Sequence, residues 1–174
     1  TMNVVFLSMT FLSLIALVTS LLFLPEIPHR PVVRTPIRSV IFHHRLRGPI
    51  LYQLMYAFGN GTFMVFVPVI AIQQGGLSAA QTGLIILVSV LSTTLFQHFF
   101  SRVSDNLCRY HLISAGSALI GLSLLLVPFY IGVLPYLTFA LLMGIGRGLS
   151  LPAMYGLVAG VGREVGHGTA SGMV

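Results

Sequence analysis

The sequence is poor in charge and contains no lysine. Only 7% of its 174 residues are charged, and nine arginines stand against three acidic residues, which gives a formal net charge of +6. Soluble domains carry about 25% charged residues, so this composition excludes a soluble domain. With 56% hydrophobic residues, it predicts an all-α integral membrane protein, folded as a polytopic helix bundle.

Cysteine and clustered metal ligands are equally scarce. The single cysteine, Cys108, excludes an internal disulfide and any cysteine-based metal or redox pair. His43 and His44 are adjacent, so on a helix they point apart, and no carboxylate accompanies them. The alternating glycines at 144–148 look like part of a dinucleotide loop, but no strand precedes them. We therefore expect no metal and no cofactor.

Long apolar runs account for most of the chain. Each is close to the roughly 20 residues that a helix needs to cross a bilayer. They predict spans at about 1–24, 49–73, 82–101, 111–131 and 136–159, with another starting at 168. Because the chain opens on Thr1 within an apolar run, we expect a fragment of a longer protein.

The arginines lie between these runs, with one exception. They stand at Arg30, Arg34, Arg38, Arg45 and Arg47, then at Arg102 and Arg109, and finally at Arg163. The connections at 74–81 and 132–135 carry no charge. This distribution is typical of membrane topology and excludes a nucleic-acid footprint. It predicts that loop 25–48 is cytoplasmic, and we expect a bacterial inner membrane protein with the lipid bilayer as its partner.

A short charged loop joins the runs 82–101 and 111–131, which predicts that the two helices are antiparallel neighbours. Asp105 and Arg109 are four residues apart, so one helical turn would bring opposite charges together. Asp105 and Asn106 are also placed to cap the helix that follows.

The same loop carries a family resemblance. Arg102-Val103-Ser104-Asp105, followed by Arg109, resembles the cytoplasmic loop motif of major facilitator superfamily transporters in its C-terminal copy. Ser101, Asn106 and Cys108 stand where the family pattern has glycine, a basic residue and glycine. Three more segments are similar to drug- or sugar-exporter-like members: 75–83 to the seam before the eighth helix, 144–152 to the tenth helix, and 166–172 to the entry of the eleventh.

The resemblance implies a piece of a twelve-helix fold, from about the sixth helix to the start of the eleventh. Residues 1–24 would be the last helix of the N-terminal half, 25–48 the central loop, and 49–174 a partial C-terminal bundle. It implies a secondary active transporter, an exporter that moves a small solute by alternating access around a midplane site. Arg102, Asp105 and Arg109 would form a cytoplasmic gate.

Polar and aromatic residues share one face of the run 49–73. At 100° per residue, that face holds Tyr52, Gln53, Tyr56, Asn60 and Phe63. Lipid-facing surface should be apolar, so we expect this stripe to line the solute path. The alternative is that its amides hydrogen-bond a neighbouring helix. A second stripe, Ser89, Thr93 and Gln97, allows the same two interpretations. The small residues at 114–121 indicate close helix packing and no site.

Arg147 is the exceptional arginine, because it lies in the middle of the run 136–159. It is too deep to reach an interface, so it should face water, an acid or an anionic solute. Met143, Ser150 and Met154 share its face, whereas Gly144 and Gly148 lie on an adjacent face suited to close packing. A role in the substrate pathway and a purely structural role remain open.

No aspartate or glutamate lies inside a span, so a coupling ion such as a proton would be carried by residues outside this chain. Two other classes of function stay open. One is an integral-membrane enzyme using His43, His44 and Asp105, although no nucleophile with a base is present. The other is a non-transporting membrane sensor or assembly protein.

Overall fold

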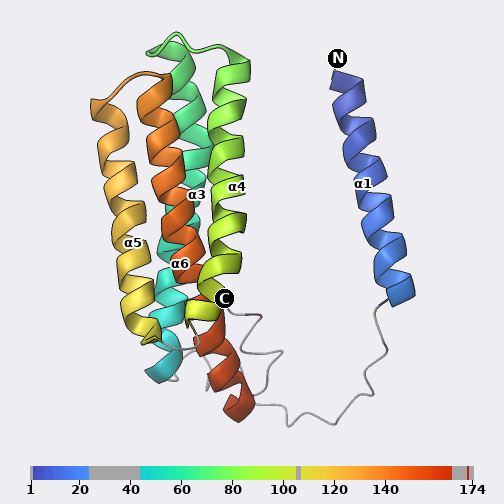
Figure 1. Cartoon of the computed structure of the whole chain (residues 1–174), viewed down its shortest axis with the longest axis vertical. Coiled ribbons are helices and arrows are strands. Elements are labelled where there is room, and N and C mark those ends of the chain that lie inside the picture. The colour runs from blue at the N-terminus through green and yellow to red at the C-terminus, as the bar shows by residue number, and fades with distance from the viewer. Residues whose placement is uncertain (1, 24–43, 105–106, 166–171, 173–174) are drawn as a thin grey trace. The chain divides into compact units, whose positions relative to one another are not determined.

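The computed structural model describes residues 2–23, 44–104, 107–165 and 172. Within them the fold is all-helical, as predicted. Its helices are α1 (Met2–Phe23), α3 (His44–Gln73), α4 (Ala79–Ser104), α5 (Arg109–Leu126), the short 3₁₀ helix η1 (Val127–Phe129) and α6 (Val133–Val165) (Figure 1). Four segments are long and apolar enough to cross a membrane: Leu46–Gln73, Ala79–Ser104, Arg109–Phe129 and Val133–Gly162.

The chain divides into two units, Thr1–Val32 and Val33–Val174. In the first unit, α1 has no charged residue, and the side chains described, at 7–22, are exposed on every face. Ser13 and Thr19 turn their hydroxyls back to the carbonyls of Met9 and Ile15, each over 2.9 Å. A helix that is apolar all round and satisfies its own hydroxyls is suited to lipid.

Three of the four bundle helices, α3, α4 and α6, are longer than the sequence predicts. α3 begins at His44, so residues 44–48 of the predicted loop are helical, and Pro49 lies inside the helix and not at its start. α6 extends the run 136–159 at both ends. α5 ends earlier than predicted, because the chain tightens into η1 around Pro128, which has no amide hydrogen to donate. The helix predicted from 168 lies outside the described residues.

Short connections set the antiparallel order of the helices. Between α3 and α4, Gly76 adopts φ 61°, a left-handed conformation that glycine reaches without strain. Ser78 and Gln81 then form a reciprocal capping box: the Ser78 amide donates to the Gln81 side chain over 2.9 Å, and the Gln81 amide donates to the Ser78 hydroxyl over 3.3 Å. Before α6, Gly132 has φ 146° and its carbonyl accepts the amide of Tyr136.

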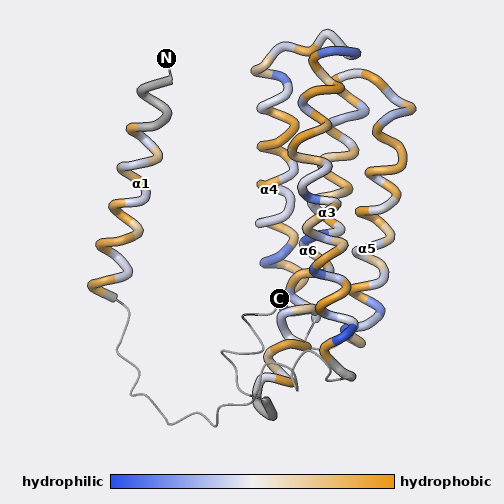
Figure 2. The backbone as a smooth tube through the Cα atoms, turned by 180° about the vertical axis from the view of Figure 1, so that it is seen from behind, coloured by the Kyte–Doolittle hydropathy of each residue, from blue (hydrophilic) through white to orange (hydrophobic). Residues whose placement is uncertain are grey.

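α6 is the central helix of the bundle. In its most apolar window 61% of the residues are buried, against 17%, 22% and 28% in α3, α4 and α5. Figures 1 and 2 show it flanked by α4 and α5, with α3 lying across it on one side. The main hydrophobic cluster lies toward the end of the bundle where α3 ends and α6 begins, and includes Phe63, Val67, Ile85, Tyr136 and Met143.

Glycines bring α6 against both flanking helices. A Cβ on Gly148 would lie 2.8 Å from the backbone nitrogen of Gln97, and a Cβ on Gly144 would collide with Ser92 of α4. This confirms the predicted close packing at Gly144 and Gly148. On the α5 side, a Cβ on Gly116 would lie 2.5 Å from the carbonyl oxygen of Gly146. These contacts, between backbones with no side chain between them, form two glycine seams along α6.

The outward faces of the bundle are apolar. α3 exposes large side chains such as Leu51, Leu54, Phe58 and Phe66, and α4 exposes Leu95 and Phe99. The tube in Figure 2 is coloured orange along much of these helices. An apolar surface of this extent is suited to contact with acyl chains, and it supports the membrane assignment that composition predicts.

Candidate solute site between α3 and α6

The predicted stripe on α3 faces the protein interior. Phe63 is buried and Tyr52, Gln53, Tyr56 and Asn60 are half-buried, whereas the exposed residues between them are Leu54, Met55, Ala57, Phe58, Gly61 and Thr62. Because successive residues rotate by about 100°, one side of α3 meets α6 and the other remains apolar and outward-facing. The structure therefore brings the aromatic and amide side chains of α3 to the face that Arg147 occupies.

Arg147 lies between two aromatic rings of α3. Its side chain is 3% exposed, and its guanidinium carbon is 5.7 Å from the ring centroid of Tyr56 and 5.7 Å from that of Phe63. Nη2 donates a weak hydrogen bond to the Met143 sulfur over 3.5 Å, and Nε is buried with no partner among the described residues. The rings offer the cation their negative faces but leave a donor unsatisfied.

No carboxylate neutralises Arg147 within the side chains that the structure describes at 46–104 and 107–162. All three acidic residues of the chain, Glu26, Asp105 and Glu164, fall outside those ranges. A buried guanidinium is ordinarily paired with a carboxylate or hydrogen-bonded on all sides. Arg147 is therefore a buried positive charge whose Nε has open hydrogen-bonding capacity.

Tyr52 and Ser150 connect α3 to α6 by a hydrogen bond. The two hydroxyl oxygens are 2.5 Å apart, and the Ser150 hydroxyl donates to the carbonyl of Gly146 over 2.8 Å. Because the Ser150 hydroxyl donates its proton to Gly146, its oxygen accepts the hydrogen bond from the Tyr52 hydroxyl. The rings of Tyr52 and Tyr56 stack with centroids 6.0 Å apart. Tyr52 is thus held at both its hydroxyl and its ring.

The amides of the α3 stripe do not make, through their oxygens, the interhelical hydrogen bonds of the alternative interpretation within the described residues. Gln53 Oε1 and Asn60 Oδ1 are buried without a partner in the described part of the chain, and so is the hydroxyl of Ser89 on α4. Thr93 donates instead to the Ser89 carbonyl of its own helix over 2.8 Å. Buried acceptors without a donor are costly in a low-dielectric interior, which indicates a place for a polar guest or water.

The remaining predicted site residues lie close to this interior. Met143 and Met154 are fully buried on α6, and Met154 packs with Leu151 and Val158 beside Tyr52 and Tyr56. The side chain of Gln97 is half-buried on α4, where its backbone nitrogen lies beside Gly148. Met143 therefore touches Arg147 directly, whereas Gln97 belongs to the α4 seam.

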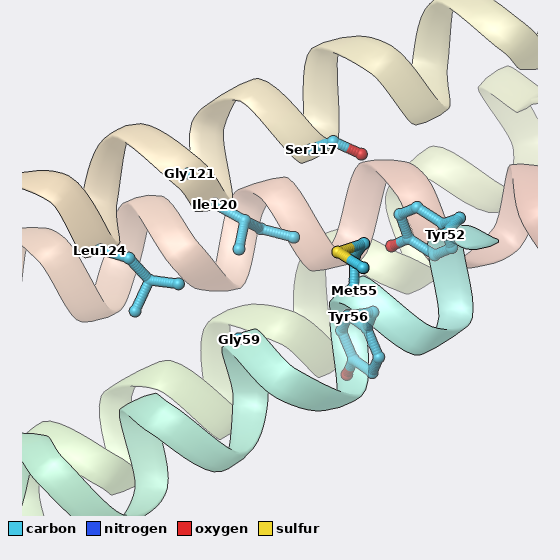
Figure 3. Close-up of a pocket in the computed structure, with 8 residues that line it drawn as sticks. All are labelled: Tyr52, Met55, Tyr56, Gly59, Ser117, Ile120, Gly121 and Leu124. Atoms are coloured by element: carbon cyan, nitrogen blue, oxygen red, sulfur yellow. The ribbon is translucent and has the colours of Figure 1, made fainter.

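A groove of about 180 Å³ opens between α3 and α5. Figure 3 shows Tyr52, Met55, Tyr56 and Gly59 along one wall and Ser117, Ile120, Gly121 and Leu124 along the other. The prediction that 114–121 forms a close-packing surface is confirmed for Gly116 but is wrong for Ser117 and Gly121, which are exposed and line the groove, because α5 turns Gly116 to α6 and these two toward α3. Their spacing of four residues, one helical turn, was the available signal.

The predicted gate is partly within the described residues. Arg109 Nη1 donates to the carbonyl of Gly156 over 2.8 Å, which ties the start of α5 to α6, and Arg102 is exposed in the last turn of α4. Asp105 lies outside the described residues. Leu107 and Cys108 are not helical, so no helical turn leads into Arg109 as the four-residue spacing suggested.

The expected cap of α5 also differs. Its N-cap residue is Cys108, whose side chain makes no capping hydrogen bond. The enzyme alternative likewise involves His43, which the structure does not describe. Among the residues that it does describe, no three histidine, cysteine or acidic side chains gather as metal ligands.

Comparison with known families gives one match. The family model for the Major Facilitator Superfamily matches residues 1–174, the whole length of the chain. No curated protein and no solved structure matches. The match agrees with the four helices in the described part of the chain that are long and apolar enough to cross a membrane, and with the motif at Arg102 and Arg109. By its sequence, this chain belongs to the Major Facilitator Superfamily.

Proposed function

We propose that this chain forms part of a secondary active transporter that exports a small solute by alternating access, with the solute path along the interior between α3 and α6. The observation that carries the proposal is Arg147: a permanent charge in mid-helix, 3% exposed, without a carboxylate among the described side chains. A charge at that depth is costly unless a pathway or a ligand requires it. Membership of a family of transporters supports the same function.

The lining of the proposed path comes from three helices. It comprises Tyr52, Gln53, Tyr56, Asn60 and Phe63 from α3, Gln97 from α4, and Met143, Arg147, Ser150 and Met154 from α6. The partnerless oxygens of Gln53 and Asn60 support a polar passage on the α3 side. The methionines supply a polarizable wall that can adapt to a guest.

The proposed gate is Arg102, Asp105 and Arg109. The hydrogen bond from Arg109 to Gly156 supports it, because it couples the loop between α4 and α5 to the central helix. We place this loop and residues 25–48 on the cytoplasmic side of a bacterial inner membrane. Arg47, Arg102 and Arg109 support that orientation, since they gather at the same end of the bundle while the connections at the other end are uncharged.

The coupling ion is proposed to be a proton carried by a carboxylate outside this chain, since the chain has no acidic residue between 27 and 104 or between 107 and 163. Arg147 would then respond to the solute, and the proton would act elsewhere.

Transport is tested with the purified protein in liposomes, loaded in turn with a panel of radiolabelled metabolites and drugs. Saturable counterflow is expected for at least one solute and is expected to rise with an imposed pH gradient. A sensor or assembly protein would show binding or complex formation without flux, and an enzyme would convert a solute without moving it. Absence of counterflow across the panel would contradict the proposal.

The gate is tested with Asp105→Asn. Turnover is expected to fall at least tenfold while thermal stability remains within a few degrees of the wild type, because the change removes a charge from a loop and leaves the helices intact. The matched control is Asn106→Ala, which alters the neighbouring position without changing charge. Wild-type turnover in Asp105→Asn would remove the residue from the gate.

A further inference from the structure

The groove between α3 and α5 shares a wall with Arg147. Tyr56 lines that groove, and the same ring carries the Arg147 guanidinium at 5.7 Å from its centroid. A solute in the groove is therefore separated from a buried cation by one aromatic side chain. Because Arg147 is buried, the field of that cation is screened less than the field of an exposed charge.

The body that fits the groove is small and apolar. Apart from the hydroxyls of Ser117, Tyr56 and Tyr52, the last of which already bonds Ser150, the side chains of the groove present apolar or aromatic surface, including Met55, Ile120 and Leu124. Its volume is about 180 Å³, and a cavity of about 150 Å³ lined by apolar side chains is known to hold benzene. A single ring or a short branched chain fills such a space.

The charge of the guest follows from what Arg147 lacks. Its Nε is buried without a partner, and no carboxylate lies among the side chains described at 46–104 and 107–162. A cationic guest would be repelled, and a neutral guest would leave the guanidinium unneutralised. The charge of a carboxylate in the groove is attracted by the guanidinium across the ring of Tyr56, which lines the groove and contacts Arg147.

We propose that the solute is a small organic monoanion, with a carboxylate directed toward Arg147 and an apolar body in the groove between α3 and α5. The inference rests on the proposed function for its physiological meaning, but binding tests it separately. In this proposal Arg147 and Tyr56 determine which charge the solute carries. Ile120, Gly121 and Leu124 determine how large its apolar body can be.

Three probes that share a benzyl body test the charge: phenylacetate, phenylacetamide and phenethylamine. Binding is measured by calorimetry on the purified protein in phosphatidylcholine nanodiscs. Phenylacetate is expected to bind at least tenfold more tightly than the neutral amide, and phenethylamine not at all. Equal affinity for the three, tighter binding of the amine, or no binding of phenylacetate would overturn the proposal.

Arg147→Gln is expected to weaken phenylacetate at least tenfold and to leave phenylacetamide unchanged, while Arg147→Lys retains part of the preference. Arg47→Gln, an exposed arginine in the first turn of α3, is the control and should bind as the wild type does. Loss of the preference in Arg47→Gln as well, or its survival in Arg147→Gln, would overturn the role of Arg147.

The groove is tested without touching the charge. Added Cβ atoms on Gly121 and Gly83 would each meet nothing within 4 Å, but only the first of these glycines lines the groove. Gly121→Leu is expected to weaken phenylacetate at least tenfold and Gly83→Leu to leave it unchanged, and this pair decides the matter even where Arg147→Gln does not fold. Equal effects of the two substitutions on phenylacetate affinity would show that the groove is not the binding site.

The outcomes also separate this inference from transport. Selective binding of phenylacetate without counterflow of any solute would contradict the proposed transporter and support the anion site. Counterflow of neutral or cationic solutes that Arg147→Gln leaves intact would contradict the anion site and support the transporter.

Discussion

Helix α6 meets its neighbours in two different ways. Against α4 and α5 it uses glycines, so that backbone lies on backbone at Gly144, Gly148 and the Gly116–Gly146 crossing. Against the first half of α3 it uses long side chains: Ser150 accepts a hydrogen bond from Tyr52, and Arg147 is held by the rings of Tyr56 and Phe63. The glycine contacts are close-packed and leave no room for a larger side chain. The contact with α3 contains buried polar atoms that have no partner among the described residues.

The difference indicates how stability and function are divided. In lipid the hydrophobic effect does not drive helices together, so the dispersion attraction of close backbone contact takes its place. The glycine seams therefore hold the bundle together. Polar groups left without partners favour a guest, and these lie along α3. We therefore expect the seams to set the free energy of unfolding and the α3 contact to set binding. Substitutions in the seams should therefore lower the free energy of unfolding more than substitutions at the α3 contact.

The largest effect is expected where a side chain is forced between α6 and α4. Gly148→Leu places a Cβ 2.6 Å from the Cβ of Phe96 and 2.8 Å from the Gln97 nitrogen, so the helices must separate. We expect the free energy of unfolding to fall by about 3 kcal/mol, measured by denaturant titration in detergent. Gly83→Leu, where nothing lies within 4 Å, should change it little. Equal stability of the two variants would refute the α4 seam.

A smaller loss is expected at the α5 seam. Gly116→Ala adds one methyl group 2.5 Å from the Gly146 carbonyl oxygen and should cost about 2 kcal/mol by the same titration. Gly121→Ala on the same helix meets no atom within 4 Å and should stabilise the protein by about 0.5 kcal/mol, because alanine restricts the unfolded chain. The comparison fails if both substitutions shift the midpoint in the same direction.

The smallest loss is expected at the α3 contact. Tyr52→Phe removes the hydrogen bond to Ser150 but keeps the ring, and interhelical hydrogen bonds in membranes contribute about 0.6 kcal/mol. Tyr155→Phe, at a half-exposed tyrosine of α6, is the control for loss of a hydroxyl. If Tyr52→Phe lowered the free energy of unfolding as much as Gly148→Leu, α3 would be joined to α6 as firmly as α4 is.

The order of the spans and most of the α3 stripe were predictable from the sequence because both depend on local periodicity. The apolar runs located every bundle helix, with errors of a few residues at the ends, as at His44 and Val165. The helical projection placed Tyr52, Tyr56 and Phe63 on one face, and the structure places them toward the interior. The face of Arg147 was found in the same way, through Met143 and Ser150.

What failed depended on neighbours distant in sequence. The polar side chains of Gln53 and Asn60 predict that this face of α3 is turned to the protein interior. Their polarity does not show that the side-chain oxygens have no hydrogen-bond partner there. The small residues of α5 were read as one packing surface, whereas the helix turns Gly116 to α6 and leaves Ser117 and Gly121 on the groove. One failure was local instead: the spacing of Asp105 and Arg109 suggested a turn of helix, but Leu107 and Cys108 are not helical.

By itself the sequence determined that this is an all-helical membrane protein, since a chain with 7% charged residues and long apolar runs can satisfy its backbone in lipid only as helices or a closed barrel, and the length of each run specifies helices. The tertiary structure decided that Arg147 lies between Tyr56 and Phe63, and that α5 completes a groove beside them. The physical reason is that hydropathy is a property of each residue, whereas the pairing of a buried charge depends on which helix lies opposite it.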